Sequence, residues 1–319
     1  MRIDRPAPRL LLVNTDTAAG DALALMLALA DPRVRLVALA INCGNVGFDQ
    51  EVENALYALE AGGAGGRVPV YAGCREPLVG RLRSVPEVWG TDGMGNARFP
   101  RARQRPEARH AVDAIIELSR AHAGRLEILS LSPLTNVAVA LTREPAVARQ
   151  VRGIYAMSGC LHAHGNVTLG AEFNAWVDPE ALRIVLRSGA PLTLLPWEVA
   201  MAGATVTAAE EAVVQRLATP VSRFYARAFR VMQTYARSRG RPGPVHADLL
   251  AMLMVLDPRV VTERRRMYVD VELGGELSRG MTLFDWMGTR SPNADVVTRV
   301  DRARVLAALR ALALSLIHI

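Results

Sequence analysis

The amino-acid sequence predicts an α/β protein in which helices wrap a parallel or mostly parallel central sheet. Apolar runs of strand length alternate with helical patterns along the chain, and this alternation is typical of such sheets. Half of the 319 residues are hydrophobic, so the chain can bury a sizeable core. We find no internal repeat and no linker, and we expect a single domain over residues 1–313. Residues 314–319 match the translation of a transposon end sequence used to prepare sequencing libraries, so we expect a non-native tail there.

The first β-α-β unit carries the most informative stretch of the chain. Residues 10–13 predict a buried strand, residues 21–30 a helix, and residues 34–41 a second buried strand. Asp16 ends the first strand and Asp21 opens the helix. Open α/β sheets bind their ligands at the carboxyl ends of the strands, so both carboxylates are expected to point into one crevice.

The rest of the chain continues the alternation. Further helices are predicted at 50–61, 110–123, 135–141, from 179 onward, across most of 208–237, at 246–256 and at 302–313. Further strands are predicted at 68–71, 126–131, 151–158, 191–195, 266–272 and 296–300. Asp178 is the expected N-cap of the helix from 179, with proline in its first turn. The segment 77–106 lacks periodicity, as functional lids and disordered loops do.

The composition narrows the classes of partner and the compartment. The net charge of +7 could indicate a nucleic-acid partner. However, the chain has no lysine, its arginines are scattered along the sequence, and only 5% of its residues are aromatic. These features disfavour a nucleic-acid-binding groove. No apolar run is long enough to span a bilayer, and the N-terminus has no apolar signal stretch. We therefore expect a soluble, cytoplasmic protein with no membrane partner. Three cysteines form neither an even disulfide framework nor a close-spaced zinc pair.

Asp16 and Asp21 are candidate metal ligands. Two anionic oxygen ligands held together at a strand end suit a hard divalent cation such as calcium or magnesium. The alternative is that Asp21 only stabilises a helix N-terminus and that Asp16 is a solvated turn residue. This stretch alone does not separate the two interpretations.

Other polar side chains also gather where predicted strands end. Asn45 and Asn136 follow strands, and Asp248 opens a late helix, as expected for one crevice fed by several strand ends. The loop 165–174 holds amides and a carboxylate beside an aromatic residue, a set that can bind vicinal sugar hydroxyls. The alternative is a loop whose polar side chains bond only their own backbone.

Several separated motifs, in order, resemble the inosine–uridine-preferring nucleoside hydrolase family from about residue 10 to about residue 313. They are the acidic strand-turn-helix 15–22, Gly44-Asn45, Asp-Gly-Met-Gly-Asn at 92–96, Pro-Leu-Thr-Asn at 133–136, Gly165-Asn166, Ala-Glu-Phe-Asn at 171–174, Val-Asp-Pro-Glu at 177–180, and Asp248 ahead of Asp257-Pro258. The resemblance implies a Rossmann-like fold with a mixed sheet and one calcium ion at its carboxyl edge. It implies cleavage of ribonucleosides to ribose and free base, by a homodimer or homotetramer.

Carried over position by position, the resemblance assigns a role to each candidate residue. The implied calcium ligands are Asp16, Asp21, Asp248 and the backbone carbonyl of Leu131. Asp16 is also the implied general base for a calcium-bound water. The implied substrate-binding residues are Asn45, Asn166, Glu172 and Asn174 at the ribose hydroxyls, with Met157 lining the pocket and Asp248 also facing the substrate.

Several positions depart from the family pattern. Gly20 stands where the family usually has the first of two adjacent aspartates, whose carboxylate normally reaches the ribose. Ala247 stands where a leaving-group histidine is common, and His246 is one residue away, on another side of the helix. Trp89 replaces a histidine of the long loop and is expected either to stack on the base or to pack in the core or a lid.

Two other classes of function stay open. A relative that binds calcium and a ribosyl ligand without catalysis is favoured by Gly20 and Ala247, whereas the retained carboxylates favour an enzyme. A phosphohydrolase with an aspartyl-phosphate intermediate needs a nucleophilic carboxylate where Asn14 stands, and an amide cannot serve. We therefore predict a calcium-dependent ribonucleoside hydrolase, with the non-catalytic relative as the alternative.

Overall fold

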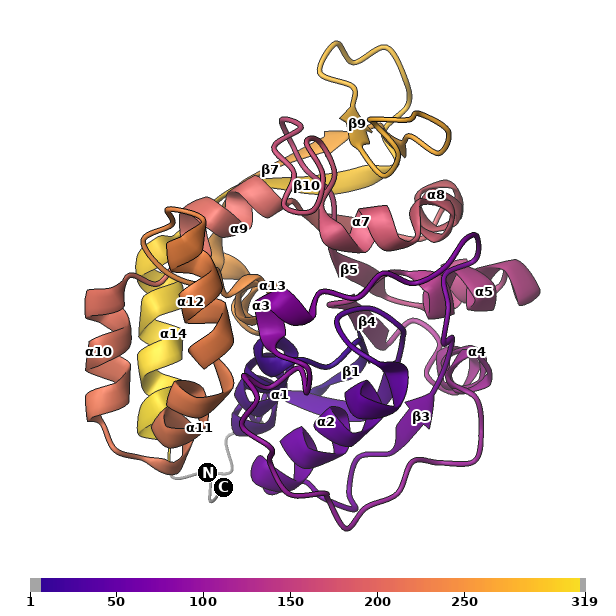
Figure 1. Ribbon diagram of the computed structural model, residues 1–319. Coiled ribbons are helices and arrows are strands. Elements are labelled where there is room, and N and C mark those ends of the chain that lie inside the picture. The colour runs from indigo at the N-terminus through magenta and orange to yellow at the C-terminus, as the bar shows by residue number, and fades with distance from the viewer. Residues whose placement is uncertain (1–6, 316–319) are drawn as a thin grey trace, which may run out of the picture.

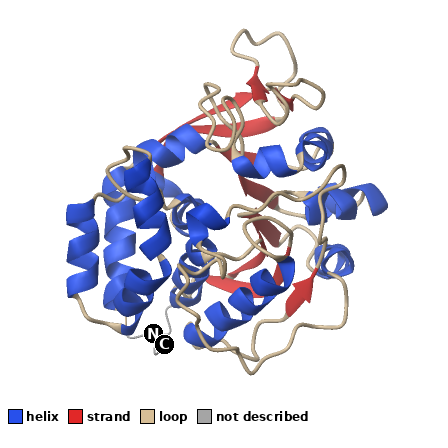
Figure 2. Cartoon of the chain, in the orientation of Figure 1, coloured by secondary structure: helices blue, strands red, loops and turns tan. Residues whose placement is uncertain are grey.

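The computed structural model describes residues 7–315 and contains an eight-stranded sheet with helices on both faces, as Figure 1 and Figure 2 show. The strands, in their order across the sheet, are β3 (Val70–Ala72), β2 (Val34–Ile41), β1 (Arg9–Thr15), β4 (Leu126–Ser130), β5 (Gly153–Met157), β6 (Leu192–Leu195), β10 (Ala294–Val300) and β7 (Val261–Met267). Neighbouring strands run parallel except for β10 and β7. The predicted mostly parallel, mixed α/β sheet is therefore confirmed.

Helices cover the sheet in layers (Figure 1). One face is covered by α1 (Ala19–Ala30), α2 (Phe48–Ala61), α9 (Trp197–Ala204), α13 (Ala247–Leu256) and α14 (Arg302–Leu314). The other face is covered by α4 (Ala111–Ala121), α5 (Thr135–Arg143) and α8 (Pro179–Arg187). An outer group contains α10 (Ala208–Arg216), α11 (Pro220–Ala228) and α12 (Arg230–Ser238). The short elements are α3 (Pro86–Trp89), α6 (Val147–Gln150), α7 (Phe173–Val177), η1 (Pro258–Val260) and a ribbon of β8 (Val269–Val271) with β9 (Thr282–Phe284).

The centre of the sheet is where the strand order reverses. The side chains of β1 are almost all buried, as expected for a strand covered on both faces. Asn14, near its end, donates its amide N–H groups to the hydroxyls of Ser130 and Ser132, and its Oδ1 accepts from Asn136 Nδ2 at 2.9 Å. These bonds join the carboxyl ends of β1 and β4 to the start of α5. The edge of the sheet beside this switch point is the expected place for a ligand.

The predicted elements occur in the predicted order, and most lie within a few residues of their observed bounds. The prediction of one strand at 266–272 is wrong. Met267 pairs with Ala294 in the main sheet, whereas Val269 pairs with Phe284 in the ribbon, so the chain changes sheets there. The helix α9 and the strand β9 were not predicted. Of the expected tail at 314–319, the last four residues lie outside the described residues. Within residues 7–315, no helix combines the length and apolarity that a bilayer crossing requires.

Candidate active site

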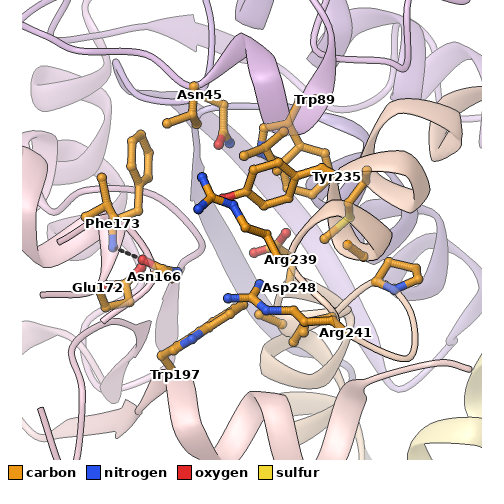
Figure 3. A pocket seen from close by; sticks show the side chains of 18 of the residues that line it. Asn45, Trp89, Asn166, Glu172, Phe173, Trp197, Tyr235, Arg239, Arg241 and Asp248 are labelled. Atoms are coloured by element: carbon orange, nitrogen blue, oxygen red, sulfur yellow. Dashed lines mark hydrogen bonds between the residues drawn. The ribbon is translucent and has the colours of Figure 1, made fainter. Parts of the chain in front are cut away.

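A pocket opens at the carboxyl edge of the sheet, beside α3, α12 and α13 (Figure 3). The site residues predicted from the sequence line this pocket, except Asp16, Asp21 and Asn136, whose amide Nδ2 instead donates to Asn14 Oδ1 and to the carbonyl of Ile41, both at 2.9 Å. The lining members of that set are Asn45, Trp89, Leu131, Met157, Asn166, Glu172, Asn174 and Asp248. Segments from across the chain therefore meet in one crevice.

Asp16 and Asp21 lie beneath the pocket wall rather than in it. Asp16 is fully buried, and its Oδ2 accepts the backbone N–H of Asn45 at 3.0 Å. Its Oδ1 has no hydrogen-bond partner among residues 7–315. Asp21, in the first turn of α1, accepts from the hydroxyl of Thr15 at 2.7 Å and from the N–H of Ala18 at 3.0 Å. Asp16 is thus a buried carboxylate and not a solvated turn residue.

The negative charges of Asp16, Asp21 and the half-buried Asp248 repel one another. Burial, together with the charges of Asp21, Glu51 and Asp248, raises the pKa of Asp16 well above its usual range. Burial and the charges of Asp21 and Glu172 do the same to the pKa of Asp248. Burial raises the pKa of Asp21 to about 6, although its two hydrogen bonds oppose the shift. A cation placed among these groups would relieve the repulsion.

The donor set fits a hard divalent cation. No three His, Cys, Asp or Glu side chains within the described part of the chain form a ready-made metal cage, and Asp21 uses both oxygens in hydrogen bonds. The unpaired Oδ1 of Asp16 supports a cation site, because burying an anionic oxygen without a partner costs free energy that a bound cation would offset. Carboxylate oxygens and a backbone carbonyl are ligands that calcium accepts.

The opposite wall is built around Glu172 and Asn174. Glu172 caps α7 and accepts the backbone N–H groups of Gly159, Asn174 and Ala175 at 2.9–3.1 Å. Burial raises the pKa of Glu172 to about 7, against the opposing effect of these bonds. Asn174 donates to the carbonyls of Leu131 and Met157 at 3.0 and 2.9 Å. This loop therefore bonds its own backbone, as the simpler interpretation expected, and also presents polar groups to the pocket.

The space beside Gly20 is filled by two other residues. A Cβ atom at Gly20 would overlap Oδ2 of Asp248 and lie 3.1 Å from Cη2 of Trp89. Trp89 lines the pocket and packs edge-on against Phe229, with ring centroids 6.4 Å apart. Asp248 and Trp89 thus occupy the room that a side chain at residue 20 would need.

Ala247 lines the pocket, whereas His246 points away from it. The Nε2 atom of His246 lies 2.9 Å from the hydroxyl of Tyr225, which donates to Glu211 at 3.0 Å. Burial lowers the pKa of His246 to about 3. This histidine is therefore a neutral packing residue, and it is poorly suited to protonate a leaving group in the pocket.

Sequence reasoning missed part of the pocket wall. The additional polar and aromatic lining residues are Glu87, Trp197, Tyr235, Arg239 and Arg241. The signal in the sequence was the Arg-Gly-Arg triplet at 239–241, shortly before Asp248. A further missed residue, Glu51, is a fully buried carboxyl in α2 whose pKa burial raises to about 8.

The chain is similar to known proteins over nearly its whole length. The sequence profile described as "Inosine-uridine preferring nucleoside hydrolase" matches residues 11–307. A protein of that name from Leishmania major is 33% identical over 305 residues, which cover 92% of this chain and 94% of the relative. A pyrimidine-specific ribonucleoside hydrolase from Salmonella enteritidis is 31% identical, with 92% and 94% coverage. The solved structure of a plant nucleoside hydrolase superposes with a TM-score of 0.90 at 29% identity and covers 97% of this chain and 99% of its own.

Proposed function

Because the chain belongs to the inosine–uridine preferring nucleoside hydrolase family, we propose that it hydrolyses the N-glycosidic bond of ribonucleosides to ribose and free base, with calcium as its cofactor. One observation carries this proposal. The carboxylate oxygen Oδ1 of Asp16 is buried without a partner among the described residues, and the other oxygen of the same carboxylate accepts the backbone N–H of Asn45, which lines the pocket together with Glu172 and Asp248. A base and groups able to hold a sugar thus share one site.

The proposed calcium ligands are Asp16, Asp21, Asp248 and the carbonyl oxygen of Leu131. A bound calcium ion would neutralise the carboxylates and lower the pKa of a nearby water. Asp16 is the proposed general base and accepts a proton from the water that attacks the anomeric carbon.

The remaining residues act on the sugar and the base. The ribose hydroxyls are held by Asn45, Asn166, Glu172 and Asn174, so that binding energy is available to distort the ring. As the glycosidic bond breaks, its electrons leave with the base and positive charge develops on the ribose. The carboxylates of Glu172 and Asp248 stabilise that charge. Trp89 offers an aromatic face or edge to the departing base.

Ribose release from purine and pyrimidine ribonucleosides tests the proposal, with calcium present and then with a chelator. We expect calcium-dependent release that falls about 100-fold or more in Asp16→Ala, because the base is lost. Asp49→Ala is the matched control, since Asp49 is exposed and, within the described part of the chain, forms an ion pair with Arg75 alone. Equal release from wild type and Asp16→Ala would contradict the proposed role of Asp16.

The second candidate is a relative that binds calcium and a ribosyl ligand without cleaving it. Two observations favour it: Gly20 leaves no carboxylate at its position, and neither Ala247 nor the buried His246 is suited to protonate a leaving base. A folded protein that binds calcium and ribose but releases no ribose from any nucleoside would establish this candidate. We also propose a homodimer or homotetramer, which sedimentation analysis measures directly.

A further inference from the structure

Two arginines stand at the mouth of the pocket. Arg239 and Arg241 follow α12, and Figure 3 shows both side chains reaching over the pocket. Their backbone is fixed, because the N–H of Arg239 donates to Tyr235 and the N–H of Arg241 donates to Ala236 at 3.0 Å. The two cations therefore belong to the construction of the pocket and not to a loose chain end.

Neither arginine has a carboxylate partner within residues 7–315. Among the described residues, no carboxylate oxygen lies within 4.0 Å of either guanidinium group. Glu87, which lines the same mouth from α3, forms no such pair with them. By contrast, Arg302 binds Glu210 at 2.7 Å. The charge at the mouth is therefore available to a ligand.

Aromatic rings hold both guanidinium groups in place. The Cζ atom of Arg239 lies 5.2 Å from the ring centroid of Tyr235, and that of Arg241 lies 5.3 Å from the ring of Trp197. A guanidinium that rests on an aromatic face keeps its N–H edge free to bind carboxylate or phosphate oxygens. The indole N–H of Trp197 is buried and also lacks a partner within residues 7–315.

The pocket is thus polarised along its length. The carboxylates of Asp248 and Glu172 lie where a ribose would develop positive charge, whereas Arg239 and Arg241 lie at the mouth. A neutral nucleoside would use only the acidic end. We propose that the preferred substrate is an anionic ribosyl compound, whose carboxylate or phosphate is bound by Arg239 and Arg241. This inference rests on the proposed function, because it names the substrate class of the same site.

Binding tests the anion site without requiring catalysis. Isothermal titration calorimetry compares two matched pairs in the presence of calcium: ribose 5-phosphate against ribose, and orotate against uracil. We expect the anionic member of at least one pair to bind about tenfold or more tightly, since hydrogen bonds to charged groups are stronger than neutral ones. The preference should shrink as salt is added, because the mouth is open to solvent.

Substitution of the arginines identifies the source of any preference. Arg239→Gln with Arg241→Gln should remove the preference for the anion, measured as the ratio of the two affinities within each pair. Arg237→Gln is the matched control, because Arg237 is exposed in the last turn of α12, just before the two arginines, and lies outside the pocket. A preference that survives the double substitution, or no preference in either pair, would overturn the inference.

Turnover separates this inference from the proposed function. The values of kcat/KM are compared for uridine, uridine 5′-monophosphate and orotidine. A higher kcat/KM for uridine 5′-monophosphate than for uridine would show that the arginines bind an anionic group on the sugar. A higher kcat/KM for orotidine than for uridine would show that they bind an anionic group on the base. Cleavage of uridine without any preference for an anionic substrate would contradict the proposed anion site and support the proposed hydrolase activity. Binding of an anion that depends on the two arginines, without cleavage of any compound, would contradict the proposed hydrolase activity and support the proposed anion site.

Discussion

A methyl group at Gly20 is predicted to impair catalysis by displacing Asp248. A Cβ atom at this position overlaps Oδ2 of Asp248 and approaches Cη2 of Trp89 to 3.1 Å. Asp248 is half-buried and lies in the first turn of α13, which packs against α1. In Gly20→Ala the carboxylate therefore has to turn away from α1.

The size of the effect follows from that displacement. The carboxylate of Asp248 must retreat by about 1 Å or more before an ordinary van der Waals separation is restored. A misplacement of about 1 Å in a catalytic site is enough to cost roughly 100-fold in rate. We expect kcat/KM for ribose release to fall by about that factor in Gly20→Ala, together with a weaker affinity for calcium. The Gly20→Asp variant has the same Cβ and adds a further negative charge to the cluster of Asp16, Asp21 and Asp248. We therefore expect no increase in kcat/KM from this variant either.

The assay combines ribose release, calcium titration and thermal unfolding. Gly47→Ala is the matched control, because a Cβ at Gly47 meets no atom within 4 Å. Gly20 lies in α1, where alanine is intrinsically favoured over glycine by about 1 kcal/mol. If the space were in fact open, Gly20→Ala would therefore raise the melting temperature and keep full activity. That result would refute the packing of Asp248 and Trp89 described above.

Two further predictions concern buried titratable groups. Burial raises the pKa of Glu172 from 4.5 to about 7, so its contribution to folding is complete below about pH 4.5 and is lost as the pH rises through 7, by up to roughly 3 kcal/mol in the calcium-free protein. Urea unfolding of wild type and Glu172→Gln at about pH 4.5 and about pH 8 measures this, and equal pH dependence in the two proteins would contradict it. His246→Phe should lower the free energy of unfolding by roughly 1–3 kcal/mol, because its contact with Tyr225 is buried. The pH–rate profile above about pH 5 should stay unchanged, since the pKa of His246 is about 3, and a shifted acid limb would speak against this.

The sheet was predictable because its strands are short, continuous apolar runs, and such runs are recognisable locally. The strand predicted at 34–41 has those bounds in the structure. The segment 261–271 was misjudged because the chain changes pairing partner after Met267, and only the partners β10 and β9 reveal that change. A local pattern shows that a segment prefers an extended conformation, but it does not show which sheet the segment joins.

The candidate site divides in the same way. Asn45, Glu172 and Asp248 were identified because short motifs preserve them and strand ends bring them together. Arg239 and Arg241 were not, because they reach the pocket only through the packing of α12 against α3, which is remote in sequence. The role of Trp197 likewise depends on contact with Arg241 and not on its neighbours in the chain.

The departures from the family pattern are connected in space. Gly20 and Trp89 are far apart in sequence, yet Trp89 and Asp248 together fill the room beside Gly20. Ala247 lies next to Asp248 in the same wall, and the unpaired Arg239 and Arg241 stand at the mouth of the same pocket. If an enzyme lost its catalytic residues one by one and without compensation, its site would contain unfilled space and scattered unpaired carboxylates. Substitutions that fill one another's space instead indicate a pocket rebuilt for a different ribosyl substrate, and this favours the hydrolase over the non-catalytic relative.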